Sequence, residues 1–130
     1  MTMNRNLRRI DSTEADTLRT IQDYLDLLQA QGKLLYLRHQ PPMMTSKMVK
    51  GKVKVIFKKP RESQLGAPDL IVFRIQNFYG VYCCEVLCIE VKSATGKLSQ
   101  AQDQWAEKAV KLGCHYIIAR SLEDAQEGMR

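Results

Sequence analysis

Apolar residues recur at helical spacing early in the chain. The stripe is formed by Leu18, Ile21, Leu25 and Leu28, and it predicts an amphipathic helix. The cluster Asp11-Ser12-Thr13 offers several N-cap candidates, and Gly32 provides the stop. Glu14 lies one turn before Leu18 on the same stripe, so we expect its carboxylate on the inward-facing side. The alternative is a first-turn glutamate that interacts with the helix dipole.

The next part of the chain predicts strands. Residues 34–38 form a short apolar run that Pro41-Pro42 ends, and a loop then leads into a strand over residues 53–57. Two β-branched runs follow, over residues 69–75 and 81–92, and the short connection between them predicts an antiparallel hairpin with its turn near Phe78 and Tyr79. The second run is apolar on both faces, which is typical of a central strand covered by helices on each side.

The last third predicts a strand between two helices. Ser99 and Gln102 match a capping box for a helix that runs to about Leu112 and stops at Gly113. Residues 114–119 then form a buried strand, and Ser121 begins a short final helix. Because a crossover helix joins them, this strand should lie parallel to the 81–92 strand. We therefore expect an α/β fold, a mixed β-sheet flanked by helices, in a single domain over residues 1–130.

Positive charge is concentrated in one segment of the chain. The formal charge is +6, yet residues 47–61 carry seven basic residues and no acidic one. Alternation with Val53, Val55 and Phe57 puts lysines together on one side of a strand, which suits a phosphate backbone. A solvated charged face is the alternative. The DNA-binding candidates in this basic loop and strand (residues 40–64) are Lys47, Lys50, Lys52, Lys54, Lys58, Lys59 and Arg61, and residues 1–10 form a basic N-terminal arm.

The cysteines and the hydropathy pattern bear on location. Cys83, Cys84, Cys88 and Cys114 lack the paired spacing of a zinc site, so we expect buried thiols in a reducing compartment. No stretch approaches the roughly 20 apolar residues that span a bilayer. We expect a soluble, cytoplasmic protein with no membrane partner.

Three charges interrupt the apolar runs of the predicted hairpin. With the turn near Phe78 and Tyr79, Asp69 pairs within about a residue of Glu90, and opposite residues have Cβ atoms about 4.5 to 5.5 Å apart. Glu90 and Lys92 point to one face because they are two residues apart. One alternative is a structural ion pair of Lys92 with either acid. Two acids and one base nevertheless leave a negative charge that Mg²⁺ or Mn²⁺ would neutralise, since oxygen ligands favour these ions over zinc.

These residues resemble a known family. The matching segments are Gly66-Ala67-Pro68-Asp69-Leu70-Ile71, Ile89-Glu90-Val91-Lys92-Ser93, Gly96-Lys97-Leu98-Ser99-x-x-Gln102, Gly113-x-x-Tyr116 and Arg120-Ser121. Together they are similar to stand-alone viral and bacterial VRR-NUC proteins, a branch of the PD-(D/E)XK nucleases with a restriction-endonuclease-like core. The resemblance runs from about Gly66 to Asp124 and implies location in a bacterial or phage-host cytoplasm.

The resemblance also implies site roles. Asp69, Glu90, the Val91 carbonyl and Glu14, which matches a glutamate of the family's first helix, would hold the metal. Lys92 would orient the nucleophile, and Gln102 matches a family glutamine at the site. Gln102 competes for this role with its place in the capping box, although both contacts can be made together.

The implied function is metal-dependent hydrolysis of DNA phosphodiesters by an activated water molecule. Similarity to stand-alone members further implies a homodimer that cuts branched DNA, such as a four-way (Holliday) junction, since a two-fold dimer presents two active sites to two strands. Two alternatives remain: a catalytically silent nucleic-acid-binding module, and a nicking, flap-cutting or restriction-type nuclease.

Overall fold

The computed structural model describes residues 13–39, 44–57 and 61–130. Its elements are, in order, α1 (Glu14–Ala30), β1 (Leu35–Arg38), β2 (Met44–Val49), β3 (Lys52–Phe57), a 3-10 helix (Glu62–Gln64), β4 (Leu70–Phe78), β5 (Val81–Val91), α2 (Gln100–Lys111), β6 (His115–Ala119) and α3 (Leu122–Gly128). Thr13, Ser99 and Ser121 cap the three α-helices, as their sequences predict. Within these ranges, no helix has the length and apolar character needed to cross a membrane.

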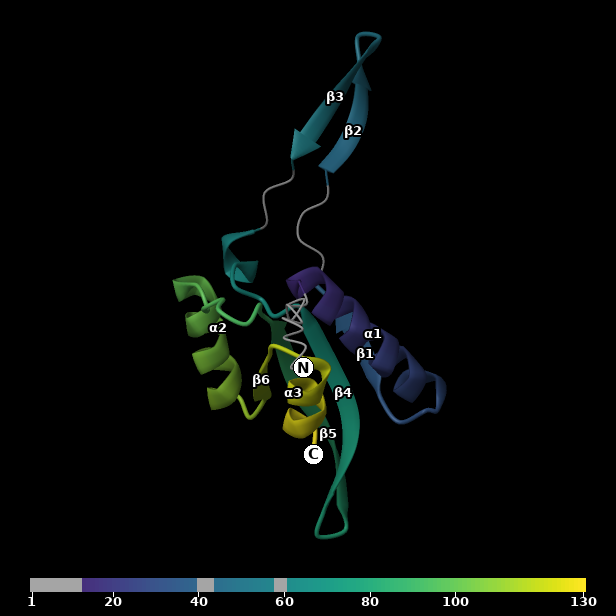
Figure 1. Ribbon diagram of the computed structural model, residues 1–130, viewed down its shortest axis with the longest axis vertical. Coiled ribbons are helices and arrows are strands. Elements are labelled where there is room, and N and C mark those ends of the chain that lie inside the picture. The colour runs from purple at the N-terminus through teal and green to yellow at the C-terminus, as the bar shows by residue number, and fades with distance from the viewer. Residues whose placement is uncertain (1–12, 40–43, 58–60) are drawn as a thin grey trace, which may run out of the picture.

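Four strands form the main sheet, in the order β1-β4-β5-β6. β1 and β5 both pair antiparallel with β4, whereas β6 runs parallel to β5. The mixed sheet and the parallel crossover through α2 confirm the α/β prediction (Figure 1). They place the carboxyl end of β5 beside the start of α2, where the polar residues of interest lie.

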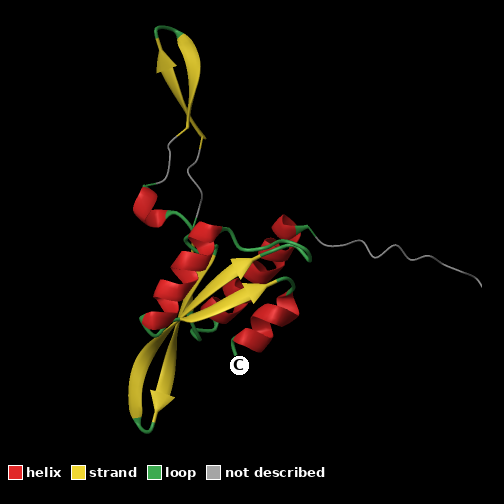
Figure 2. Ribbon diagram, turned by 90° about the vertical axis from the view of Figure 1, so that its left-hand side faces the viewer, coloured by secondary structure: helices red, strands yellow, loops and turns green. Residues whose placement is uncertain are grey.

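Helices cover both faces of this sheet. Figure 2 shows the strands between α2 on one side and α1 and α3 on the other. The main core lies on the α1 and α3 side, because Ile21 and Leu25 of α1 and Ala125 of α3 pack with Leu70, Val72, Leu87 and Ile89. Alternation along β4 and β5 sends Asp69 and Glu90 to the α2 side.

A separate two-stranded hairpin differs from the sequence prediction. Residues 44–49, expected as a loop, form β2 and pair with β3. Lys50 and Gly51 have φ angles of 52° and 74° and form the two-residue connection, as in a type I′ turn. Met48, Val53 and Val55 are exposed, so no core covers these three apolar residues of the hairpin.

The central strand β5 is buried along only part of its length. Glu85, Leu87 and the residues from Cys88 to Val91 are buried, whereas residues 81–84 are exposed. The expectation of a run covered on both faces is wrong for this outer part. The expectation of four buried thiols is wrong in the same place, since Cys83 and Cys84 are exposed, Cys88 is buried and Cys114 is half-buried. The hairpin extends beyond the helices that would cover it (Figure 1).

Candidate active site

The hairpin register brings two acids together. Leu70 pairs with Ile89, which places Asp69 opposite Glu90, as predicted. The Asp69 amide donates to Oε2 of Glu90 at 3.2 Å, and the Val91 amide donates to Oδ2 of Asp69 at 2.8 Å. Each carboxylate is thus tied to the backbone of the opposite strand, so both face one point with little freedom.

Glu90 is buried, and its charge is only partly compensated. It is 2% exposed, and Nζ of Lys92 lies 3.6 Å from its Oε1. Burial, followed by the Asp69 carboxylate, raises the pKa of Glu90 from 4.5 to about 7, although Lys92 acts in the opposite direction. The ion pair considered above therefore exists, but it does not offset the cost of placing two acids together.

Gln102 makes both contacts considered from its sequence position. Its Oε1 accepts a hydrogen bond from the Ser99 amide at 2.9 Å, completing the capping box. Its Nε2 donates to Oε1 of Glu90 at 2.8 Å. Because the cap fixes the amide orientation, the start of α2 positions a donor on the buried acid.

Gly66 brings the Asp69 segment against α2. Its φ is +82°, and a Cβ at this position would lie 2.2 Å from the Ala101 carbonyl oxygen and 2.7 Å from the Gln102 nitrogen. Since no side chain fits this gap, the glycine allows the backbone before Asp69 to approach the first turn of α2. Pro68, which follows, is fully buried.

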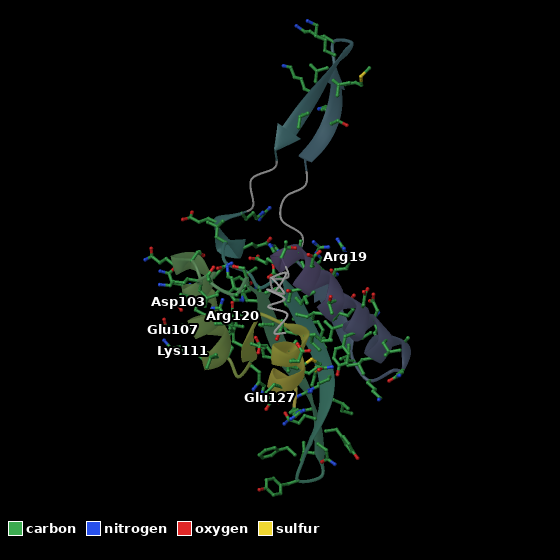
Figure 3. All side chains as sticks on the ribbon, viewed as in Figure 1. Arg19, Asp103, Glu107, Lys111, Arg120 and Glu127 are labelled. Carbon is green, nitrogen blue, oxygen red and sulfur yellow. The ribbon has the colours of Figure 1, made fainter. Side chains whose placement is uncertain are left out.

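Arg120 supports the turn that follows Lys92, a role that its sequence position did not reveal. Its guanidinium Nη1 donates to the carbonyl oxygens of Ser93 and Gly96 at 2.5 and 2.7 Å. Figure 3 shows Arg120 between α2 and α3. The β6 end is thereby linked to the loop between β5 and α2, whose ends carry Lys92 and Gln102.

Tyr116 contributes a hydroxyl that has no hydrogen-bond partner. It is the one such buried side-chain atom within the described residues. Tyr116 is the β6 partner of Cys88, on the face that carries Glu90. Burial raises its pKa, and the negative charges of Glu90 and Asp69 add to this effect.

Glu14 does not lie where the helical stripe predicts. Its side chain is exposed in the first turn of α1, after the Thr13 cap. In the described ranges, no cluster of three His, Cys, Asp or Glu side chains could hold a metal ion. The inward-facing placement is therefore wrong, and the position matches the dipole alternative. A metal-binding role for Glu14 stays a prediction.

The predicted DNA-contacting residues are partly described. Lys47, Lys50, Lys52 and Lys54 are exposed on the β2–β3 hairpin, and Arg61 is exposed before the 3-10 helix. Lys47 lies opposite Lys54, and Lys52 shares their face, so three lysines do gather on one side. Lys58, Lys59 and the N-terminal arm lie outside the described residues.

The donor set fits a hard divalent cation. Asp69 and Glu90 offer carboxylate oxygens close together, and burial, followed by the Asp69 charge, raises the pKa of Glu90. Mg²⁺ and Mn²⁺ prefer oxygen ligands and would relieve this charge. Because no third acid joins the pair among the described residues, backbone oxygen and water would supply the other positions there.

A comparison with protein families agrees with this geometry. The VRR-NUC domain model matches residues 12–123, whereas no curated protein and no solved structure matches the chain. The matched region includes β4, β5 and α2, which carry the acids, the lysine and the glutamine. The match implies a nuclease-type function in DNA processing. With most of its length matched, the chain belongs to the VRR-NUC family of PD-(D/E)XK-like nuclease domains.

Proposed function

We propose that this protein is a divalent-metal-dependent endonuclease that hydrolyses DNA phosphodiesters at the site formed by Asp69, Glu90 and Lys92. The observation that carries the proposal is a pair of acids, Glu90 buried and Asp69 half-buried, which backbone amides fix beside a single base, Lys92. A structural ion pair alone would not need two acids beside one base.

Each residue then has a distinct task. Asp69, Glu90 and the Val91 carbonyl would hold Mg²⁺ or Mn²⁺, which lowers the pKa of water and offsets charge on the phosphate. Lys92, 12% exposed, would orient the attacking water and stabilise negative charge that develops on the phosphate oxygens. Gln102 holds the Glu90 carboxylate in place. Glu14 would add a ligand only if the start of α1 approaches the pair.

The β2–β3 hairpin supplies the proposed contacts with DNA. Lys47, Lys52 and Lys54 share one face and Lys50 lies at the turn, with no acidic residue in either strand. Such a row binds phosphates without reading sequence. We extend the proposal to a homodimer that cuts branched DNA, because two copies would present one active site to each of two strands.

Cleavage assays with matched variants test the catalytic proposal. Wild type with Mg²⁺ or Mn²⁺ should cut DNA, whereas Glu90→Ala and Lys92→Ala should lose activity at least about 100-fold. Glu107→Ala and Lys111→Ala are the controls, since this pair is exposed on α2 and should leave activity unchanged. Full activity of Glu90→Ala would contradict the proposal. Glu14→Ala tests the outer ligand in the same assay.

A panel of DNA substrates separates the branched-DNA proposal from the alternative functions. Four-way junctions, flaps, splayed arms and linear duplex should be cut in that order of preference if the branched-DNA proposal holds. A flap-cutting enzyme would cut the flap best, and a nicking or restriction-type enzyme would cut linear duplex at least as well as the four-way junction. A silent binding module would bind all of them with a steep salt dependence and cut none.

A further inference from the structure

The outer part of the β4–β5 hairpin is an exposed surface without charge. Residues 75–84, which we call the ribbon, contain no charged residue, although such residues make up 26% of the chain. Its largest side chains are mostly exposed: Ile75 70%, Phe78 61%, Tyr79 94%, Val81 66% and Tyr82 68%. Figure 1 shows this hairpin extending past the neighbouring strands and α3. The ribbon thus presents aromatic and aliphatic side chains to solvent on both faces.

Both edges of the ribbon are also open. Within the described residues, β1 pairs with β4 only as far as Phe73, and β6 pairs with β5 only from Leu87 onward. Open edges of monomeric proteins are usually protected by lysine, proline or a covering loop. The ribbon contains neither lysine nor proline. An unprotected apolar edge of this kind is typical of a surface that pairs with another chain.

The composition of the ribbon argues against DNA as the occupant. A phosphate backbone is bound by Lys and Arg, and the exposed lysines of β2 and β3 lie on a different hairpin. The ribbon also begins six residues after Asp69, which is roughly 20 Å along an extended strand. A protein partner with a neutral, apolar surface fits it better.

A second copy of this chain has such a surface. Two molecules that each carry a charge of +6 repel where their basic surfaces meet, whereas two ribbons meet without opposing like charges. The three aromatic side chains and two aliphatic ones expose on the order of 600 Å². A stable interface needs about 800 Å² from each partner, so the ribbon provides most of the area.

A neighbouring groove supplies the remaining contact area. A cavity of about 620 Å³ lies where β1 begins, lined by Gly32 and Leu35 on one side and by Phe73, Ile75 and Tyr82 on the other. Lys33 and Arg74 also line it, and a ribbon without charge can enter it without like-charge repulsion. We propose that the ribbon of each protomer packs along the β4 edge and this groove of a second copy, forming a two-fold interface. The proposal deepens the homodimer named under the proposed function and rests on it. With the axis near Ile75, the two sites lie within about 40 Å, close to the ~34 Å of one helical turn of DNA.

Sedimentation velocity tests the interface directly. Wild type at micromolar concentration should sediment at about twice the 14.9 kDa chain mass, and Phe78→Ser/Tyr82→Ser should sediment as a monomer. Leu112→Ser is the matched control, because Leu112 is 84% exposed on the α2 side and away from the ribbon; it should stay dimeric. Cooperative thermal unfolding of the double variant shows that it is folded. A dimeric double variant or a monomeric wild type overturns the inference.

The measurement is independent of catalysis. A wild-type dimer that cuts no DNA would support the interface and contradict the nuclease proposal. A wild-type monomer that cuts DNA would support the nuclease proposal and contradict the interface. If wild type is a monomer and the double variant binds DNA more than tenfold more weakly, the ribbon is a nucleic-acid surface and the inference is wrong.

Discussion

The stability of the metal-free protein should fall as Glu90 ionises. Burial and Asp69 raise the pKa of Glu90 from 4.5 to about 7, so the folded protein holds a proton that the unfolded chain has released between these values. The corresponding stabilisation is complete below the unfolded pKa and is lost as the pH rises through about 7. At about 1.4 kcal/mol per pKa unit, raising the pH from about 5 to about 8 should remove about 2 to 3 kcal/mol.

Urea unfolding in the presence of EDTA measures this loss. The free energy of unfolding is obtained by linear extrapolation at each pH, for wild type and for Glu90→Gln. The variant cannot ionise at this position, so its loss of stability over this pH range should be smaller than that of wild type by about 2 to 3 kcal/mol. Ionisable groups away from Glu90 occur in both proteins, so their contributions cancel in the difference.

Addition of a divalent ion should reverse the effect. Mg²⁺ or Mn²⁺ at about 100 times its dissociation constant should stabilise wild type by about 2.7 kcal/mol, and most strongly above the pKa of Glu90, because proton and metal compete. Glu90→Gln should gain much less. Equal pH dependence of the two proteins would refute the reasoning, because Glu90 would then have an ordinary pKa in the folded chain.

Three further predictions follow from individual contacts. Gly66→Ala should destabilise the fold by about 3 kcal/mol or more in urea unfolding, because the new Cβ meets the Ala101 carbonyl and the φ angle is unfavourable; a smaller loss would mean that the loop can move away. Tyr116→Phe should raise the free energy of unfolding by about 1 kcal/mol, since it removes a buried hydroxyl without a partner, and a fall would reveal an unseen partner. Lys52→Ser/Lys54→Ser should lower the log–log salt slope of DNA affinity by about 1.8, and an unchanged slope would place the DNA elsewhere.

The register of the active-site hairpin could be predicted because local turn chemistry determines it. Tyr79 and Gly80 have positive φ angles, and the Asn77 side chain accepts a hydrogen bond from the Gly80 amide. The turn lies one residue later than predicted, which moves the partner of Asp69 two residues along β5: a two-residue turn at Phe78 and Tyr79 would pair it with Cys88, whereas the observed turn pairs it with Glu90. A hairpin of fixed loop length carries its register along the whole ladder, so two residues far apart in sequence could be placed together.

The burial of individual residues could not be predicted in the same way. The helical stripe of α1 predicts an inward-facing Glu14, but burial along this helix begins only at Thr17, so Glu14 is exposed. Likewise, the apolar run of β5 shows where a strand lies but not that the helices end before Cys83. Periodicity shows which side of a helix or strand faces the core, whereas burial depends on where the neighbouring helices and strands end.

The strand β2 was missed for a related reason. Residues 44–49 follow Pro41-Pro42 and contain Ser46 and Lys47, so they lack the apolar alternation that marks a half-buried strand. Among the described strands β2 pairs with β3 alone, and its polar composition agrees with the exposure of Met48, Val53 and Val55 on this hairpin. The Lys50-Gly51 turn joins it to β3. This two-residue turn signal is short and lies within a segment whose clearest feature is its positive charge.

The contacts around Glu90 hold its charge in place and do little to relieve it. The capping box orients Gln102 toward this acid, Gly66 allows the Asp69 segment to reach the same helix turn, and Arg120 holds the loop after Lys92. An apolar residue at position 90 would pack in this core without the cost of a buried acid beside another acid. Retaining the pair is reasonable if a ligand offsets that cost, and a divalent ion is the ligand that two carboxylates at one point bind best. The instability predicted for the metal-free protein and the proposed cleavage activity therefore have the same physical origin.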